Sequence, residues 1–115
     1  MLEKQEQIFK ALSDRSRIRI MKMLQNKKLC VCEIRAVLGL ANSTVSQHLS
    51  ILKDSGLILD EKDGKWVNYM INKNNTDKDV KNAILYIFLG LEEDETTRKD
   101  KIMIEKANRI TICCK

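Results

Sequence analysis

The chain has 115 residues, of which 43% are apolar and 32% charged, with no proline and a formal net charge of +5. This length and composition fit one domain with one modest core and exclude a disordered chain. No apolar run reaches the roughly 18 residues of a membrane-spanning helix, and the charged residues 1–7 lack the apolar centre of a signal peptide. We therefore expect a small cytoplasmic protein, with no membrane partner, whose single domain spans residues 1–115.

The first half of the chain predicts four helices. The spacing of apolar residues predicts a first helix over about 1–12, and Asp14 can cap a second. In the second helix we expect the basic side chains to face outward, namely Arg15, Arg17, Arg19 and Lys22. A short third helix should end at Gly39. A fourth, with Asn42 or Ser43 as its cap, should end at Gly56 and bury a stripe made of Val45, Leu49 and Leu52.

In the second half of the chain the spacing of apolar residues changes from a helical to a strand-like period. Residues 57–59 and 66–71 read as two strands, and Asp63-Gly64 between them is a strong hairpin signal. Asn75 or Thr76 should cap a fifth helix over about 77–93, and a sixth should cover about 98–108. This order predicts a mainly α fold with a β-hairpin, typical of a winged helix-turn-helix.

The fourth helix separates two chemistries. Its buried stripe leaves short polar side chains on the other face, namely Ser43, Thr44, Ser46 and Gln47. Such side chains suit a DNA major groove, since Gln can bond adenine through two atoms and Ser or Thr can bond base edges or phosphate. The alternative is an ordinary capped helix, because Thr44 and Gln47 have the spacing of a capping box.

Three further residues are candidate contacts to the DNA backbone. His48 is the single histidine, and we interpret it as a phosphate contact rather than a metal ligand. Lys62 and Lys65 at the hairpin tip can reach phosphates or the minor groove. Three nearby acids, Asp60, Glu61 and Asp63, should weaken the field there. Residues 1–29, with eight basic and three acidic side chains, account for the whole net charge of +5, which allows nucleic-acid binding without requiring it.

The four cysteines form two tight pairs, Cys30 with Cys32 and Cys113 with Cys114. A disulfide within either pair would close almost no loop, so the pairs are unsuited to stapling a fold. In a reducing cytosol they fit soft-metal ligands or a redox switch. Residues two apart in a helix lie about 200° around its axis, so chelation requires Cys30 just before the helix or an unwound first turn. The alternative is two small buried apolar side chains.

Four segments together resemble the ArsR/SmtB family of metal-sensing repressors: LSDRSRIRI (12–20), LCVCEI (29–34), STVSQHL (43–49) and GKWVNY (64–69). The resemblance implies a homodimeric winged-helix repressor that leaves double-stranded operator DNA when metal binds. One departure is Arg15, where the family often has proline.

The resemblance also implies which ions bind. Arsenite-responsive relatives often carry Cys-x-Cys-x-x-Cys, but the third position here is Arg35, so Cys113 or Cys114 would supply the missing thiolate. As(III) or Sb(III) takes three thiolates, whereas Cd(II) or Pb(II) can take four. The fifth helix has no histidine and so lacks the site of Zn, Co and Ni sensors. An accidental exposed tail is the alternative for Cys113 and Cys114.

Residues 83–91 are apolar nearly all round, which predicts a dimer interface. We expect dimerisation elements over about 1–12 and 76–108, followed by a cysteine-bearing tail over 109–115. A two-fold dimer matches a palindromic operator.

An enzyme is not expected, because the sequence has no nucleophile–base constellation, phosphate loop or paired acids. The leading hypothesis is a repressor released by As(III) or Sb(III). A Cd(II)/Pb(II)-responsive repressor and a thiol-redox-switched DNA-binding protein remain alternatives.

Overall fold

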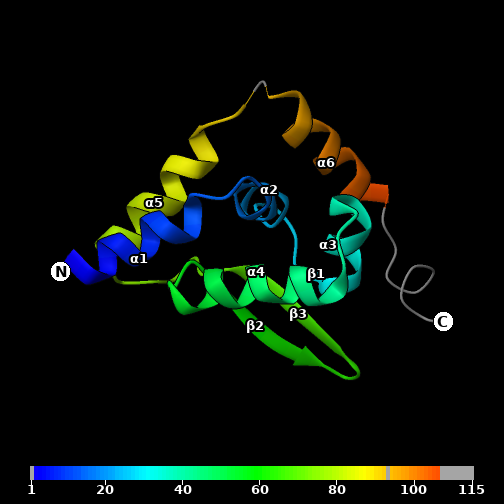
Figure 1. Ribbon diagram of the computed structural model, residues 1–115, viewed down its shortest axis with the longest axis horizontal. Coiled ribbons are helices and arrows are strands. Elements are labelled where there is room, and N and C mark those ends of the chain that lie inside the picture. The colour runs from blue at the N-terminus through cyan, green and yellow to red at the C-terminus, as the bar shows by residue number, and fades with distance from the viewer. Residues whose placement is uncertain (1, 93, 107–115) are drawn as a thin grey trace.

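The computed structural model describes residues 2–92 and 94–106. Within these residues the elements are α1 (Leu2–Leu12), α2 (Arg15–Met23), β1 (Leu29–Cys30), α3 (Val31–Leu38), α4 (Asn42–Asp54), β2 (Ile58–Asp63), β3 (Trp66–Ile71), α5 (Lys78–Leu89) and α6 (Glu95–Lys106). Figure 1 shows α2 at the centre, with α1 and α5 on one side and α3 and α6 on the other. Helices α3 and α4 with the β2–β3 hairpin form the predicted winged helix-turn-helix.

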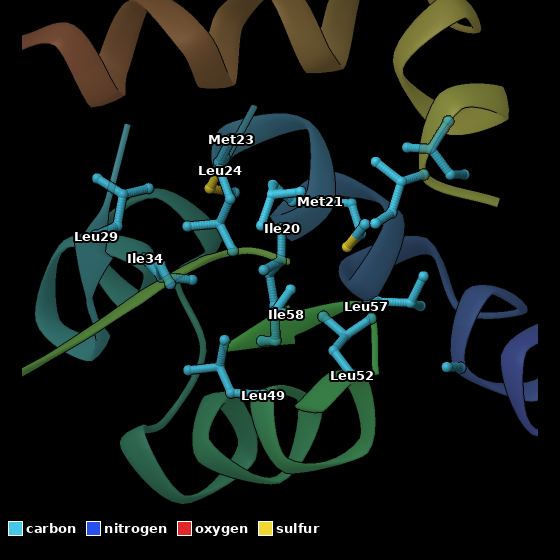
Figure 2. Close-up of a cluster of buried hydrophobic side chains, with 14 of the residues drawn as sticks. Ile20, Met21, Met23, Leu24, Leu29, Ile34, Leu49, Leu52, Leu57 and Ile58 are labelled. Carbon is cyan, nitrogen blue, oxygen red and sulfur yellow. The ribbon is translucent and has the colours of Figure 1, made fainter. Parts of the chain in front are cut away.

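The predicted stripe of α4 forms the floor of the core. Val45, Leu49 and Leu52 are each 0% exposed, and Leu49 and Leu52 project toward α2 (Figure 2). Above them lie the buried side chains Ile20, Met21, Leu24, Leu57 and Ile58. Because burying a large aliphatic side chain stabilises the fold by about 1.5–3 kcal/mol, this contact holds α4 firmly and keeps its polar face outward.

A short strand that the sequence analysis did not predict completes the sheet. The strand order is β1-β3-β2, all antiparallel, with Leu29 opposite Tyr69 and Cys30 opposite Asn68. Strand β2 also extends to Asp63, which pairs with Trp66 beside the predicted hairpin turn at Gly64. A two-residue strand has no periodicity to read, so β1 becomes visible only when β3 lies beside it.

The predicted outward orientation of Lys22 is wrong. Its side chain is 1% exposed, and Nζ donates to the carbonyl oxygens of Phe88 at 3.2 Å and Gly90 at 2.9 Å. These carbonyls end α5, where the helix dipole favours a cation. Burial holds the pKa of Lys22 below its ordinary value. The residues that receive this lysine lie 66 and 68 positions away, beyond the reach of a local pattern.

Several helix boundaries also differ from prediction. Helix α4 begins one residue earlier than the predicted caps allow, with Ala41 as its N-cap. Helix α5 is capped by Asp77, whose carboxylate accepts from Asp79 N at 2.9 Å, rather than by Asn75 or Thr76. Asn75 instead accepts from Asp77 N at 2.6 Å. Helix α5 ends at Leu89, before the predicted end at 93, and α6 begins at Glu95 rather than at 98, while the predicted end of the sixth helix at 108 lies outside the described residues.

Helix α6 folds back onto its own chain. Arg19 of α2 makes two hydrogen bonds to the buried Asp100, at 2.8 and 2.9 Å, and Lys101 Nζ donates to Gln25 Oε1 at 3.0 Å. This places α6 over α2 and beside α3 (Figure 1). Over the described residues, none of the helices combines the length and apolar character required to cross a membrane.

Candidate DNA interface and thiol site

The outer face of α4 carries the predicted reading side chains. Ser43, Thr44, Ser46 and Gln47 are all exposed. Because the N-cap is Ala41, Thr44 lies inside the helix, and the capping box with Gln47 does not form. Gln47 is therefore free to meet a ligand with both amide atoms. The structure thus offers a polar surface that no local capping role explains.

His48 lies at the edge of this face and is half-buried. Its Nδ1 atom is 3.0 Å from Nη1 of Arg17, which comes from α2. The same Arg17 donates to the carbonyl oxygen of Ala11 at 2.7 Å, so it joins α1, α2 and α4. The predicted outward orientation of Arg17 is therefore wrong: its side chain is 13% exposed, and its partner His48 lies 31 positions away, beyond the reach of a local pattern.

The β2–β3 hairpin, called the wing below, is less acidic than the sequence suggests. Lys62 and Lys65 are exposed, and Lys65 Nζ lies 5.1 Å from the centroid of the Trp66 ring. Two of the three neighbouring acids pair with lysines from elsewhere in the fold, Glu61 with Lys28 at 2.6 Å and Asp60 with Lys53 at 3.1 Å. These pairs neutralise the charges that were expected to weaken the field, which favours phosphate contact by the wing.

Cys30 occupies the position that chelation requires. It is the N-cap of α3, with extended backbone angles of φ −91° and ψ 168°, and Cys32 lies in the first turn behind it. Both carry free thiols; Cys30 is buried and Cys32 half-buried. The 200° separation expected within a regular helix therefore does not apply to this pair.

Glu33 holds the start of α3. Its side chain is 5% exposed, and its carboxylate accepts a hydrogen bond from Cys30 N at 3.0 Å. Burial raises the pKa of the Cys30 thiol, and the nearby Glu33 backbone N–H opposes that change. The Cys-x-x-Glu spacing is that of a capping box with a thiol as the cap, a signal that the sequence analysis could have used.

The ligand set is incomplete within the described part of the chain. Among these residues no group of three His, Cys, Asp or Glu side chains is placed to hold a metal ion. The predicted ligands Cys113 and Cys114 lie outside the described residues. The two thiols at α3 fit a soft, thiophilic ion, and a third donor has to come from elsewhere.

A third surface lies between α1 and α5. Large apolar side chains are exposed there: Phe9 at 69%, Tyr86 at 79% and Leu89 at 69%. Phe9 and Tyr86 border a cavity of about 530 Å³ that is also lined by Ile8, Leu12 and Ile87. A patch of this kind is typical of a protein–protein interface.

Comparison with known proteins identifies several relatives of this chain. Residues 14–59 match the model of the bacterial regulatory protein, arsR family. The arsenical resistance operon repressor of Bacillus subtilis (strain 168) is 37% identical over 89 residues, covering 76% of this chain and 85% of that protein. The arsenical resistance operon repressor of Escherichia coli (strain K12) is 42% identical over 67 residues, covering 57% of each chain. This chain thus spans little more than half the length of the latter.

A cadmium resistance regulator, the CadC homolog of Staphylococcus aureus, is 35% identical over 80 residues, covering 69% of this chain and 66% of that protein. Among solved structures, a homodimeric winged helix-turn-helix DNA-binding domain from Mycobacterium bovis aligns with a TM-score of 0.66 at 25% identity, covering 80% of this chain and 82% of that one. HlyU from Vibrio cholerae aligns with a TM-score of 0.62 at 30% identity, covering 74% and 88%. These relatives are regulators rather than enzymes.

Proposed function

The chain belongs to the ArsR family of bacterial regulatory proteins, and on that premise we propose that it is a cytoplasmic transcriptional repressor released from operator DNA by As(III) or Sb(III). The observation that carries this proposal is the position of Cys30. It is at once the last residue of β1 and the N-cap of α3, the helix that leads into the DNA-reading helix α4.

DNA binding is assigned to α4 and the wing. Gln47 would read a base edge in the major groove, with Ser43, Thr44 and Ser46 around it. His48, Lys62 and Lys65 would contact the backbone. The exposure of the α4 face and the pairing of Asp60 and Glu61 with lysines support this assignment.

The repressor would act as a homodimer joined through α1 and α5. The exposed Phe9, Tyr86 and Leu89 support this, as does the homodimeric relative from Mycobacterium bovis. A two-fold dimer presents two α4 helices to successive half-sites of a palindromic operator.

The inducer site would begin with Cys30 and Cys32. Each cysteine thiol would replace one hydroxyl of arsenite, the As–S bond forming as the As–O bond breaks and the thiol proton leaving with the hydroxyl as water; the likeness to arsenical resistance repressors supports this ion class. We assign the third thiolate to Cys113 or Cys114 of the same chain, because α6 packs against its own α3. The seven residues from 107 to 113 can span at most about 25 Å.

Two structural routes connect this site to the DNA-binding elements. Helix α3 packs on α4 and is separated from it by the left-handed Gly39, whose φ is 71°. Cys30 is also paired with Asn68 of β3, and Asn68 Nδ2 lies 3.4 Å from Asp63 at the wing tip. Drawing Cys30 and Cys32 onto one ion would therefore disturb the reading helix and the wing together, which couples ligand binding to DNA release.

A Cd(II)- or Pb(II)-responsive repressor is the second candidate, supported by the similarity to the Staphylococcus aureus CadC homolog. Such an ion would take four thiolates and use both tail cysteines. A thiol-redox switch is the third, since Cys30 and Cys32 are both free thiols.

One titration separates these candidates. A duplex selected from a random library by the reduced protein is labelled, and its release is followed by fluorescence anisotropy. We expect arsenite to release the DNA at lower concentration than Cd(II), and peroxide, added to the reduced protein after the reductant has been removed, to have no effect. Release by Cd(II) alone would favour the second candidate, and release by peroxide alone the third.

A further inference from the structure

The side chain of Arg17 makes contacts with α1, with Asp14 and with α4, although it lies behind the exposed polar face of α4. Its side chain is 13% exposed. Nε donates to the Ala11 carbonyl at 2.7 Å, Nη2 to the Lys10 carbonyl at 3.3 Å, and Nη1 lies 3.0 Å from His48 Nδ1. Asp14 is 4.0 Å from the same Nη1. The guanidinium is thus held from several sides and has little freedom to leave His48.

This contact determines where the proton of His48 resides. A guanidinium has only donor N–H groups and stays protonated in proteins. The Nδ1 atom facing it must therefore offer a lone pair, which requires a neutral imidazole with its hydrogen on Nε2. In the other tautomer, or in the imidazolium, an N–H on Nδ1 of His48 would face an N–H on Nη1 of Arg17, and no hydrogen bond could form.

We propose that Arg17 is a positioning residue that fixes His48 as the Nε2–H tautomer, so that α4 presents a neutral hydrogen-bond donor to a phosphate oxygen of DNA. Phosphate oxygens only accept, so a donor whose orientation and tautomer are already fixed matches them without further ordering. The positive charge at 3.0 Å also polarises the ring and strengthens that donor. This inference rests on the proposed DNA binding.

The tautomer can be measured without DNA. His48 is the single histidine of the chain, so ¹⁵N NMR of its ring is unambiguous. At about pH 8, Nδ1 should resonate as unprotonated and Nε2 as protonated. Arg17→Met should give a mixture of tautomers, whereas the matched change at the exposed Arg15, Arg15→Met, should leave the spectrum unchanged. A protonated Nδ1 in the unaltered protein would overturn the inference.

The phosphate contact is tested by isosteric changes. The amide of Gln reaches about as far as Nε2, and that of Asn about as far as Nδ1. His48→Gln should therefore keep DNA affinity within about threefold, and His48→Asn should lose about tenfold or more, the effect of one hydrogen bond to a charged group. Because the donor is neutral, neither change should alter the salt slope, whereas Lys62→Ala should reduce it by about one.

Equal losses for Gln and Asn, or a reduced salt slope, would overturn the neutral-donor contact. If the unaltered protein bound no DNA at all, the proposed function would fail and the phosphate contact with it. The NMR result would still decide whether Arg17 fixes the tautomer.

Discussion

The first turns of α3 and α4 lie close together in sequence but are built in opposite ways. The N-cap of α3 is the buried Cys30, which pairs with β3 and donates its backbone N–H to the Glu33 carboxylate. The N-cap of α4 is the exposed Ala41, which has no capping side chain, and the polar residues of α4 point to solvent. A perturbation at α3 must therefore move backbone, whereas side chains on α4 can change while the backbone stays. The arrangement at α3 suits a site where ligand binding changes the backbone, and the arrangement at α4 suits a surface that contacts DNA through its side chains.

The largest effect should come from removing the thiols of Cys113 and Cys114, which are proposed to complete the ligand set begun by Cys30 and Cys32. The double variant Cys113→Ser, Cys114→Ser should need at least about tenfold more arsenite to release DNA, because a two-thiolate remnant binds a metalloid weakly. Each single variant should differ little from the unaltered protein, since one neighbouring thiol can replace the other. If Cd(II) is the inducer, each single variant should already weaken the response. An unchanged arsenite response in the double variant would remove the tail from the ligand set.

The proposed base recognition by the exposed face of α4 is tested by Gln47→Ala. Loss of a two-atom base contact should weaken specific DNA binding by about 1–3 kcal/mol, while thermal unfolding and arsenite affinity stay as they were. The exposed Ser50 on the same helix offers the control Ser50→Ala, which should have a smaller effect. If affinity and base preference survive Gln47→Ala, α4 does not read DNA through this residue.

A smaller effect is expected from the cap of α3. Glu33→Ala leaves the Cys30 N–H without its acceptor and should lower the free energy of unfolding by about 1–2 kcal/mol. Glu33→Gln keeps an oxygen in place and should cost less than half as much. Chemical denaturation of both variants measures the difference. Equal stability of the Ala variant and the unaltered protein would show that the capping bond does not hold the first turn.

The same contrast explains what could be predicted from sequence. The stripe of Val45, Leu49 and Leu52 and the hairpin between the two predicted strands are local patterns, and both occur in the structure, although Asp63 belongs to β2 and the turn itself consists of Gly64 and Lys65. Strand β1 and the burial of Lys22 depend on segments far along the chain, namely β3 and the end of α5. Local periodicity contains no information about such partners, so the prediction failed there.

The site shows the same division. The exposed residues of α4 follow from helix geometry and were predicted, and the position of Cys30 ahead of α3 is one of the two arrangements that geometry allowed for chelation. The pairing of Glu61 with Lys28 and the contact of Arg17 with His48 arise from tertiary packing across 33 and 31 positions. Charge counts along the sequence therefore overestimated the unpaired negative charge near the hairpin tip.

If the thiols at the start of α3 control DNA binding, Cys30→Ser should separate DNA binding from its release. Serine is a good N-cap, so the variant should fold and bind the selected duplex as the unaltered protein does. It lacks one thiolate, so arsenite at concentrations that fully release the unaltered protein should leave the variant on DNA, as measured by fluorescence anisotropy. Release of Cys30→Ser at the same arsenite concentration would show that this thiol does not control DNA binding.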